Sequence, residues 1–357
     1  MKKKLSAAGL GLTFAGSILG PGFVSGQELW LYFGSYGLKG IAGLLLSIAI
    51  LIVFNILVMR ITELTGDETM DRIVFSGNAA PWLREGCGLL FVFFYFCVTV
   101  VMLAGLASLG NRLFGLPLWA GGLIATVLIL SAAYFGLAGM TTVFNICIPV
   151  LVGAAILISV LRIATVGPEQ IVLSENPSNP LLGNFLFSSV NYAACNLFAG
   201  IGIMGPLVAL MKNRKSIPAG ITLGGILLLS IALAVILSLS TSPQSTLEDL
   251  PMLSLSLQMG AVFGAVYGVL LFMGMFGSAV ATIVAVDTYM AAKFSVYKRR
   301  RILFLLLLGI IAYLLSLFGF SGLVGTIYPI MGYVGAITMV LLILRRAKLG
   351  KAQKKDI

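Results

Sequence analysis

Long runs of apolar residues recur along the whole chain and are separated by short polar stretches. Most runs have about 20 residues or more, the length that an α-helix needs to cross about 30 Å of hydrocarbon. The pattern predicts ten membrane-spanning helices, at residues 5–33, 38–60, 86–110, 116–138, 141–163, 183–211, 217–240, 256–291, 302–320 and 322–344. The first, sixth and eighth runs are too long for one straight crossing. We therefore expect an all-α integral membrane protein with irregularities in these three spans.

The composition supports this membrane class. Hydrophobic residues make up 59% of the chain and charged residues only 10%, whereas a soluble domain carries about 25% charged residues. Since the loops are short, residues 1–357 are expected to form a single transmembrane domain with a basic tail at 345–357. The net charge of +11 invites a nucleic-acid partner, but the basic residues stand in short clusters between apolar runs. We expect the lipid bilayer, and no nucleic acid, as a partner.

The distribution of Lys and Arg predicts the topology. An N-terminus inside and ten crossings place 20 of the 23 basic residues on the cytoplasmic side, all except Lys39, Arg112 and Arg162. The basic start at residues 2–4, followed by an apolar run, resembles a secretory signal. Its removal would leave nine spans and break the charge pattern at one end. We predict a multi-pass protein of the inner membrane with both termini in the cytoplasm.

Two of the long spans contain breaks in the helical pattern. In the first span, Pro21 lacks an N–H, and the glycines around it lower helix stability further. The sixth span is rich in Gly and polar side chains over residues 191–206. Interrupted helices are tolerated at membrane depth where their backbone lines a cavity, although Gly and Pro are also simply common in membrane helices.

The two breaks lie five spans apart, and five is an odd number. The second repeat, at about 183–344, would therefore be inverted relative to the first, at about 5–163. Corresponding interruptions in inverted repeats are typical of the binding site of a secondary transporter. The chain has no histidine, Walker loop or dinucleotide fingerprint, so we expect neither an enzyme nor an ATP-driven pump.

The residues at the first break resemble a family motif. The stretch Gly20–Glu28, followed by Tyr32-Phe33 and Tyr36-Gly37, is similar to the GAGFxSGQE signature of the YkvI-like bacterial membrane proteins. Looser similarities lie at Asn196–Pro206 and Tyr328–Tyr333. The resemblance implies the amino acid–polyamine–organocation superfamily and a leucine-transporter (LeuT) fold with a five-plus-five inverted repeat and broken helices 1 and 6. Pro21 departs from the motif, which has alanine there, and could stiffen the hinge.

Glu28 is the most informative single residue. A carboxylate near the middle of a membrane is costly and usually functional. It could bind a substrate ammonium group, coordinate Na⁺ or carry a proton. The alternative is a structural role, in which Glu28 caps free N–H groups of the interrupted sixth helix.

We predict that the substrate site forms around the two breaks, where backbone groups and dipoles fit a zwitterion such as an amino acid. Its residues are Gly20, Gly22, Phe23, Ser25, Gly26, Gln27, Glu28, Tyr95, Asn191, Tyr192 and Asn196. The polar residues of the sixth span could instead tie helices together, and Tyr95 could be a packing aromatic.

Ion coupling is assigned to the first and eighth spans. Ser278 and Thr282 are four residues apart and face the same way. The resemblance implies a sodium site formed by such hydroxyls and by carbonyls of the first helix, whereas the alternative is bonding to their own i−4 carbonyls. Asp287 could couple a proton or only face Lys293 or the arginines at 299–301. The predicted coupling residues are Glu28, Ser278, Thr282 and Asp287, with Na⁺ as the one ion that could act as a cofactor and no metal site.

Three functions follow from these observations. The first is a secondary transporter of a small solute, an amino acid or related amine, driven by Na⁺ or H⁺. The second is a ligand sensor or receptor subunit that keeps the transporter fold without coupled flux. The third is a channel, which would need a polar stripe or a charged ring that this chain does not offer. Transport is favoured because the sequence has no dedicated signalling domain.

Overall fold

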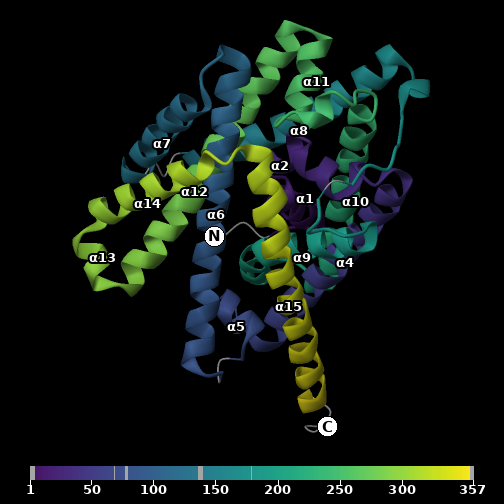
Figure 1. The fold of residues 1–357 in the computed structure, drawn as a ribbon. Coiled ribbons are helices and arrows are strands. Elements are labelled where there is room, and N and C mark those ends of the chain that lie inside the picture. The colour runs from purple at the N-terminus through teal and green to yellow at the C-terminus, as the bar shows by residue number, and fades with distance from the viewer. Residues whose placement is uncertain (1–4, 68, 77–78, 136–139, 178, 354–357) are drawn as a thin grey trace.

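The computed structural model describes residues 5–67, 69–76, 79–135, 140–177 and 179–353. Its regular elements within these residues are helices (Figure 1). The longer ones are α4 (Gly37–Thr65), α6 (Pro81–Phe114), α7 (Leu118–Phe135), α8 (Met140–Val166), α9 (Phe185–Leu207), α10 (Ile217–Leu239), α12 (Ala261–Lys293), α14 (Arg301–Ser316) and α15 (Phe320–Gln353). The shorter ones are α1 (Ala7–Ile18), α2 (Pro21–Val24), α3 (Gln27–Leu29), η1 (Trp30–Gly34), α5 (Met70–Val74), η2 (Pro168–Gln170), η3 (Val208–Leu210), η4 (Arg214–Ser216), η5 (Ser245–Leu247), α11 (Pro251–Met259) and α13 (Ser295–Arg299).

The first predicted span is divided into several helical pieces. Helix α1 ends at Ile18, and α2 begins at Pro21, whose fixed φ and missing N–H suit the first position of a helix. A second turn follows at Gly26, which has a φ of 84°, in the left-handed region that glycine adopts without strain. Helices α3 and η1 then complete the span, so the chain around Glu28 is irregular on both sides.

Helix α9 changes direction within its length. Its two parts, Phe185–Phe198 and Gly200–Leu210 with η3, are inclined by 54°. The eighth predicted span, 256–291, was expected to be irregular because of its length, and the structure divides it. Helix α11 ends at Met259, and Gly260, with a φ of 149°, separates it from α12. The position of this break was not predicted, because residues on both sides of Gly260 are hydrophobic.

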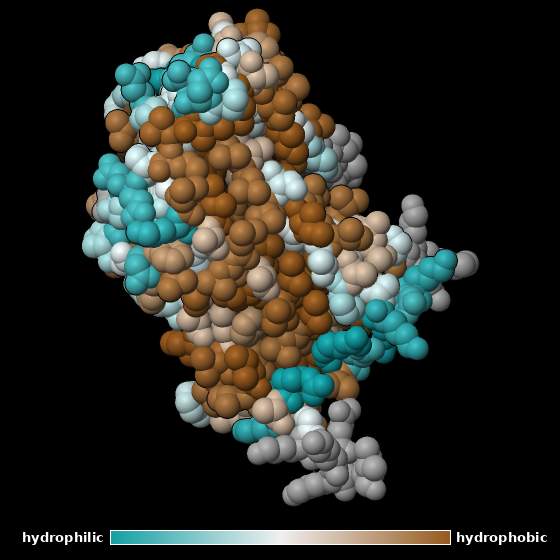
Figure 2. Space-filling model, turned by 90° about the vertical axis from the view of Figure 1, so that its right-hand side faces the viewer, coloured by the Kyte–Doolittle hydropathy of each residue, from teal (hydrophilic) through white to brown (hydrophobic). Residues whose placement is uncertain are grey.

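The described residues include six helices that are long and apolar enough to cross a membrane, and seven if the two parts of α9 form one span. Three shorter apolar helices, at Ala7–Ile18, Leu118–Tyr134 and Arg301–Ser316, lie where further spans were predicted. Figure 2 shows one face of the molecule with a broad hydrophobic surface and hydrophilic residues gathered toward its margins. The chain is thus an all-α membrane protein, while the number of ten spans and the inverted repeat remain predictions.

The helices pack as two groups. Helix α9 packs against α4 and α15, and α1 packs against α10, which also touches α4. In the second group, α6 packs against α12, α7 and α14. Helix α8 contacts both α10 and α12, and α15 also contacts α6, so the two groups are joined. Because α1 and α9 belong to the first group and α2 packs against α12 of the second, the irregular first span lies at the boundary between the groups.

Candidate functional site

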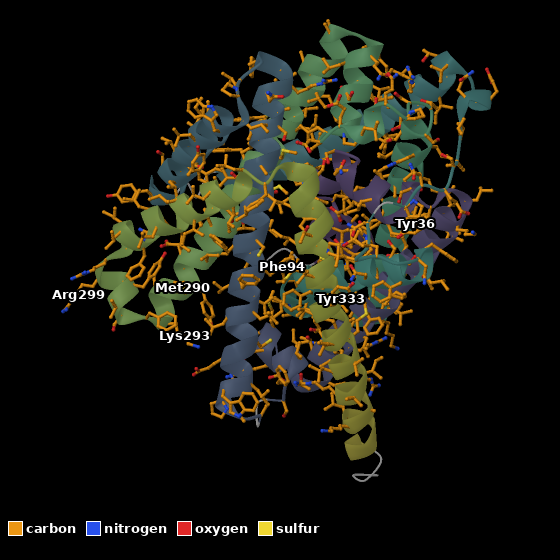
Figure 3. The ribbon with its side chains drawn as sticks, viewed as in Figure 1. Tyr36, Phe94, Met290, Lys293, Arg299 and Tyr333 are labelled. Atoms are coloured by element: carbon orange, nitrogen blue, oxygen red, sulfur yellow. The ribbon has the colours of Figure 1, made fainter. Side chains whose placement is uncertain are left out.

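A cavity of about 260 Å³ lies where α1 gives way to α2. Helices α6, α9, α12 and α15 supply the other walls. Its lining residues are Ser17, Ile18, Gly20, Pro21, Gly22, Glu28, Phe94, Tyr95, Val98, Met102, Cys195, Asn196, Ile203, Ser278, Ala281, Thr282 and Tyr328. Phe94, on α6, lies near the middle of the molecule in Figure 3. The cavity therefore brings together residues that are more than three hundred positions apart in the chain, from Ser17 to Tyr328.

The Glu28 carboxylate is the chemical centre of this cavity. Its side chain is only 6% exposed. A Cβ atom on Gly22 would lie 2.8 Å from Glu28 Oε2 and 3.7 Å from the Tyr328 hydroxyl, so the carboxylate rests directly against the start of α2. The side chains of Asn196 and Tyr192, both from α9, lie close enough to Glu28 to interact with it electrostatically. Glu28 thus joins the two irregular segments.

The hydroxyls on α12 face a hydroxyl on α6. Thr282 Oγ1 donates to the Ser278 carbonyl at 2.9 Å and lies 2.8 Å from Thr99 Oγ1. The hydrogen bond from Thr282 to the carbonyl four residues earlier is the structural alternative to a sodium site that the sequence left open. The contact of Thr282 with Thr99 joins α12 to α6. Ser278 and Thr282 both line the cavity, opposite the end of α1.

Several predicted residues lie outside the cavity. Asn191 accepts from the Tyr32 hydroxyl at 3.1 Å and donates to the Pro329 carbonyl at 2.9 Å, so it ties α9 to η1 and α15. Tyr192 and Phe23 are buried and are not among the lining residues. Ser25 donates to the Gly22 carbonyl at 2.9 Å.

Gly26 and Gln27 are also outside the lining. A Cβ on Gly26 would meet Leu239 and Met252 at 2.7 and 3.0 Å, so this glycine packs under α10 and α11. The Oε1 atom of Gln27 is buried and has no hydrogen-bond partner in the described part of the chain.

Asp287 has a separate environment near the C-terminal end of α12. It is buried, and Arg301 binds it through Nη2 at 2.7 Å and through Nε at 2.9 and 3.1 Å. The Tyr297 hydroxyl donates to it at 3.0 Å. The predicted pairing with the arginines at 299–301 is present, and it connects α12 to α13 and α14.

Sequence reasoning missed part of the lining. Phe94, Val98 and Met102 follow the helical spacing of Tyr95 and could have been added from periodicity alone. Tyr328 belongs to the stretch Tyr328–Tyr333, which resembles the family but was not predicted to line the site. Cys195 directly precedes Asn196 and carried no signal of its own.

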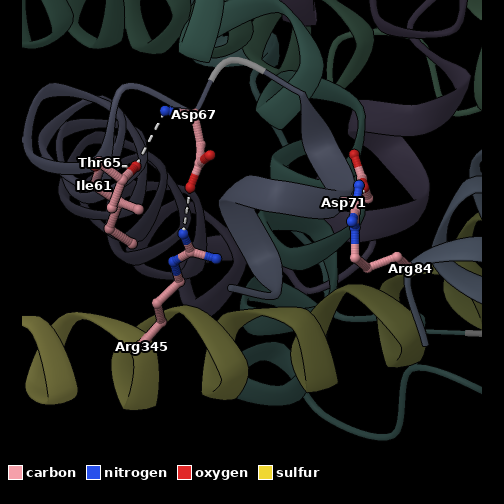
Figure 4. Close-up of polar contacts among 6 residues, drawn as sticks. All are labelled: Ile61, Thr65, Asp67, Asp71, Arg84 and Arg345. Carbon is pink, nitrogen blue, oxygen red and sulfur yellow. Dashed lines mark hydrogen bonds and ion pairs between the residues drawn. The ribbon is translucent and has the colours of Figure 1, made fainter. Parts of the chain in front are cut away.

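A second, larger cavity of about 680 Å³ lies at the end of the molecule that holds α5. Tyr95 lines both cavities and therefore stands at their junction. This larger cavity, which we call the vestibule, is bordered by two ion pairs, Arg84 with Asp71 at 2.8 Å and Lys293 with Glu85 at 3.4 Å. Figure 4 shows Arg84 beside Asp71 and, nearby, Arg345 bound to Asp67.

Asp71 lies in the short helix α5, outside the predicted spans, and is paired with Arg84. Burial raises the pKa of this carboxyl, but hydrogen bonds from Thr69 and Arg84, together with the Arg84 charge, outweigh burial and lower the pKa below its usual range. Asp71 is therefore ionised at neutral pH and holds Arg84 at the vestibule wall.

The opposite end of the molecule is covered by α11 and its preceding loop. The Met252 N–H donates to the Ser25 carbonyl at 2.9 Å, and the Tyr267 hydroxyl donates to the Val24 carbonyl at 2.5 Å. Asp249 accepts from the Ser108 and Ser321 hydroxyls, each at 2.6 Å. These bonds join α2, α6, α12 and α15 above the cavity.

The comparisons with known proteins agree with this architecture. The membrane protein YkvI of Bacillus subtilis is 27% identical over 97% of this chain and 98% of its own length, and YyaD of the same organism is 26% identical over 93% and 95%. No family model matches the chain. The crystal structure of MhsT in complex with L-phenylalanine superposes with a TM-score of 0.65 at 16% identity, over 96% of this chain and 90% of that chain.

This chain is similar to YkvI over nearly its whole length, and it has the LeuT fold of MhsT. A manganese transporter of Eremococcus coleocola is also similar to this chain, with a TM-score of 0.54 at 13% identity over 96% of this chain and 86% of its own. At such identities the solved structures show the fold alone.

Proposed function

We propose that this chain is a secondary active transporter of a small solute, an amino acid or a related amine, that works by alternating access. The observation that carries the proposal is the cavity at the end of α1, where the buried Glu28 carboxylate meets α9 and α12. Solute sites of secondary transporters lie between interrupted helices at such a boundary. The bound L-phenylalanine of MhsT, a protein of similar fold, supports the solute class.

We propose the arrangement of the spans and their orientation in the membrane together with this function. Helices α1 and α2 would be the broken first span and α9 the broken sixth span of ten, in a five-plus-five inverted repeat. The vestibule would face the cytoplasm of a bacterial cell, with both termini on that side of the inner membrane. In support, Arg112 and Arg162, predicted to lie outside, contact Glu248 and Thr241 near α11.

The coupling ion is proposed to act through the same cavity. Glu28 would carry a proton or contact Na⁺, and Ser278 and Thr282 would supply oxygen ligands to Na⁺ opposite the break in the first span. Asp287 is the weaker candidate, because Arg301 already compensates its charge.

Thermal unfolding of the purified protein provides the first test. The midpoint would be recorded with a panel of amino acids and amines, in Na⁺ and in K⁺, and at two pH values. A ligand that binds only the folded state at 100 times its Kd stabilises it by about 2.7 kcal/mol. A shift that requires Na⁺ assigns sodium coupling, and a shift that depends on pH but not on Na⁺ assigns proton coupling.

Reconstitution into liposomes then separates the transporter from the receptor alternative. Ligand-dependent stabilisation without uptake under any imposed ion gradient would favour a sensor with the transporter fold. No stabilisation by any compound, together with no uptake, would contradict the proposed function.

A further inference from the structure

The cavity carries a single fixed charge. Glu28 is the one Asp, Glu, Lys or Arg among its lining residues, all of which the structure describes. Removing an ionised carboxylate from water costs several kcal/mol unless a counter-charge or a proton compensates it. No basic side chain lines the cavity, so the compensation must come from a proton, a bound Na⁺ or a cationic group of the ligand.

The vestibule, which adjoins the cavity, contains basic side chains, but these are already paired with carboxylates. Arg84 and Lys293 line the vestibule and are bound to Asp71 and Glu85. Neither lines the cavity around Glu28. A ligand carboxylate placed there would therefore face the Glu28 charge without a cationic side chain to balance it.

Several polar groups of the cavity use a donor hydrogen within their own helix. The Ser17 hydroxyl, the Asn196 amide and the Thr282 hydroxyl each donate to a carbonyl of their own helix, at 2.7, 3.1 and 2.9 Å. Pro21 has no N–H, so the Ser17 carbonyl lacks its partner four residues later. The Asn196 and Tyr192 side chains also interact with the Glu28 carboxylate. The Ser17 carbonyl and the Glu28 carboxylate are acceptors that suit an ammonium group, which has three donors and no acceptor.

The rest of the wall is aromatic and apolar. Phe94, Tyr95 and Tyr328 present rings that can hold a cation over their faces. Val98, Met102 and Ile203 leave room for a hydrocarbon group. At about 260 Å³ the cavity lies just below the roughly 300–1,000 Å³ range of most ligand pockets, which favours a compact solute.

We infer, on the basis of the proposed transport function, that the cavity accepts small apolar monoamines as ammonium ions and discriminates against the α-amino acids that carry the same side chain. The discrimination arises because the carboxylate of the amino acid meets Glu28 in a site of low polarity. This narrows the proposed solute from amino acids and amines to compounds without a free carboxylate.

Isothermal titration of the full chain in detergent tests the inference with three related ligands. Phenethylamine, L-phenylalaninamide and L-phenylalanine share a ring, but only the last carries a carboxylate. We expect the first two to bind at least tenfold more tightly than L-phenylalanine, which corresponds to about 1.4 kcal/mol. L-Phenylalaninamide separates the effect of charge from that of size.

Two variants locate the discrimination. Glu28→Gln keeps the shape of the side chain and should weaken phenethylamine binding at least tenfold. Glu63→Gln, which alters a carboxylate paired with Arg60 outside the cavity, should leave it unchanged. Equal losses in both variants would overturn the assignment to Glu28.

The remaining outcomes are also decisive. L-Phenylalanine binding as tightly as phenethylamine, or more tightly, would overturn the inference and leave the proposed transport of amino acids standing. If neither phenethylamine nor isoamylamine binds, the inference is overturned as well, and uptake of other solutes then decides separately whether the chain is a transporter.

Discussion

Gly22 allows the carboxylate of Glu28 to reach the break in the first span. The residue contributes no side chain, and Glu28 Oε2 occupies the space that a Cβ atom would need. The nearest obstacle is the end of a flexible side chain, so a methyl group at this position would displace Glu28 while the backbone keeps its course. We therefore expect ligand binding to depend on a glycine that itself makes no polar contact through a side chain.

Gly22→Ala is therefore expected to weaken the binding of a stabilising amine or amino acid by about tenfold, or 1.4 kcal/mol, with little change in the unfolding midpoint of the free protein. The matched control is Gly16→Ala in α1, because a Cβ there meets no atom within 4 Å. Thermal unfolding with and without ligand measures both variants. Unchanged binding in Gly22→Ala would contradict the placement of Glu28.

Asp71 gives a pH-dependent prediction. A carboxyl whose folded-state pKa is lowered adds stability above its unfolded pKa and loses it as the pH falls through the folded value. Asp71→Asn should lower the free energy of unfolding at pH 7 by up to about 1 kcal/mol, as expected for a partly exposed pair. The difference from the wild type should shrink below pH 3.8, the ordinary pKa of this group. Denaturation at pH 7 and at acid pH measures it, and an equal difference at both would refute the role of the ion pair.

Part of the site follows from residue patterns, and part does not. Glu28, Asn196, Ser278 and Thr282 were predicted as site residues, and the structure places all four around one cavity. Asn191 and Asn196 are five residues apart, which separates them by about 140° around a helix at 100° per residue. The sequence shows that they differ in direction, but only the packing of α9 against α15 decides which one faces the cavity.

At the scale of elements, α11 and its preceding loop close one end of the molecule. Asp249 holds this loop to both groups of helices through Ser108 on α6 and Ser321 at the start of α15. Its carboxylate accepts three hydrogen bonds, including one from the Ser321 N–H at 3.1 Å. Such a bridge favours the conformation in which the cavity is separated from that end.

Asp249→Asn should loosen this closure, because the amide cannot accept at both of its ends. The readout is labelling of Cys195, which lines the cavity, by an impermeant maleimide added at the α11 end, in a variant without the other cysteines. We expect labelling to become several times faster. Glu248→Gln is the control, since Glu248 makes only a half-exposed pair with Arg112 at 3.5 Å. Equal rates in both variants would argue against a latch at Asp249.

Helix interruptions could be predicted from the sequence where proline and glycine cause them. Pro21 and the surrounding glycines predicted an irregular first span, and the chain is interrupted there. The length of the eighth run predicted an irregularity there, but its position at Gly260 was not predicted, because the apolar run continues across this glycine and only its backbone angle breaks the helix. The bend of α9 lies among glycines, yet its size of 54° is set by packing.

At the scale of the whole molecule, the two packing groups meet at the cavity. The vestibule adjoins the cavity at Tyr95, whereas hydrogen bonds from α11 and α12 cover the opposite end. This asymmetry is expected of one state of an alternating-access cycle. A rocking motion of one group against the other would exchange the open and covered ends. The inverted relation of the two halves, which would make such a motion symmetric, remains a prediction.

The most direct measurement is uptake by liposomes that contain the wild type or Glu28→Gln. The labelled solute would be the amine or amino acid that stabilises the wild type most. The account predicts gradient-driven accumulation by the wild type and a loss of at least tenfold in Glu28→Gln, with Glu63→Gln unaffected. Uptake by Glu28→Gln at the wild-type rate would contradict the claim that solute moves through the Glu28 cavity.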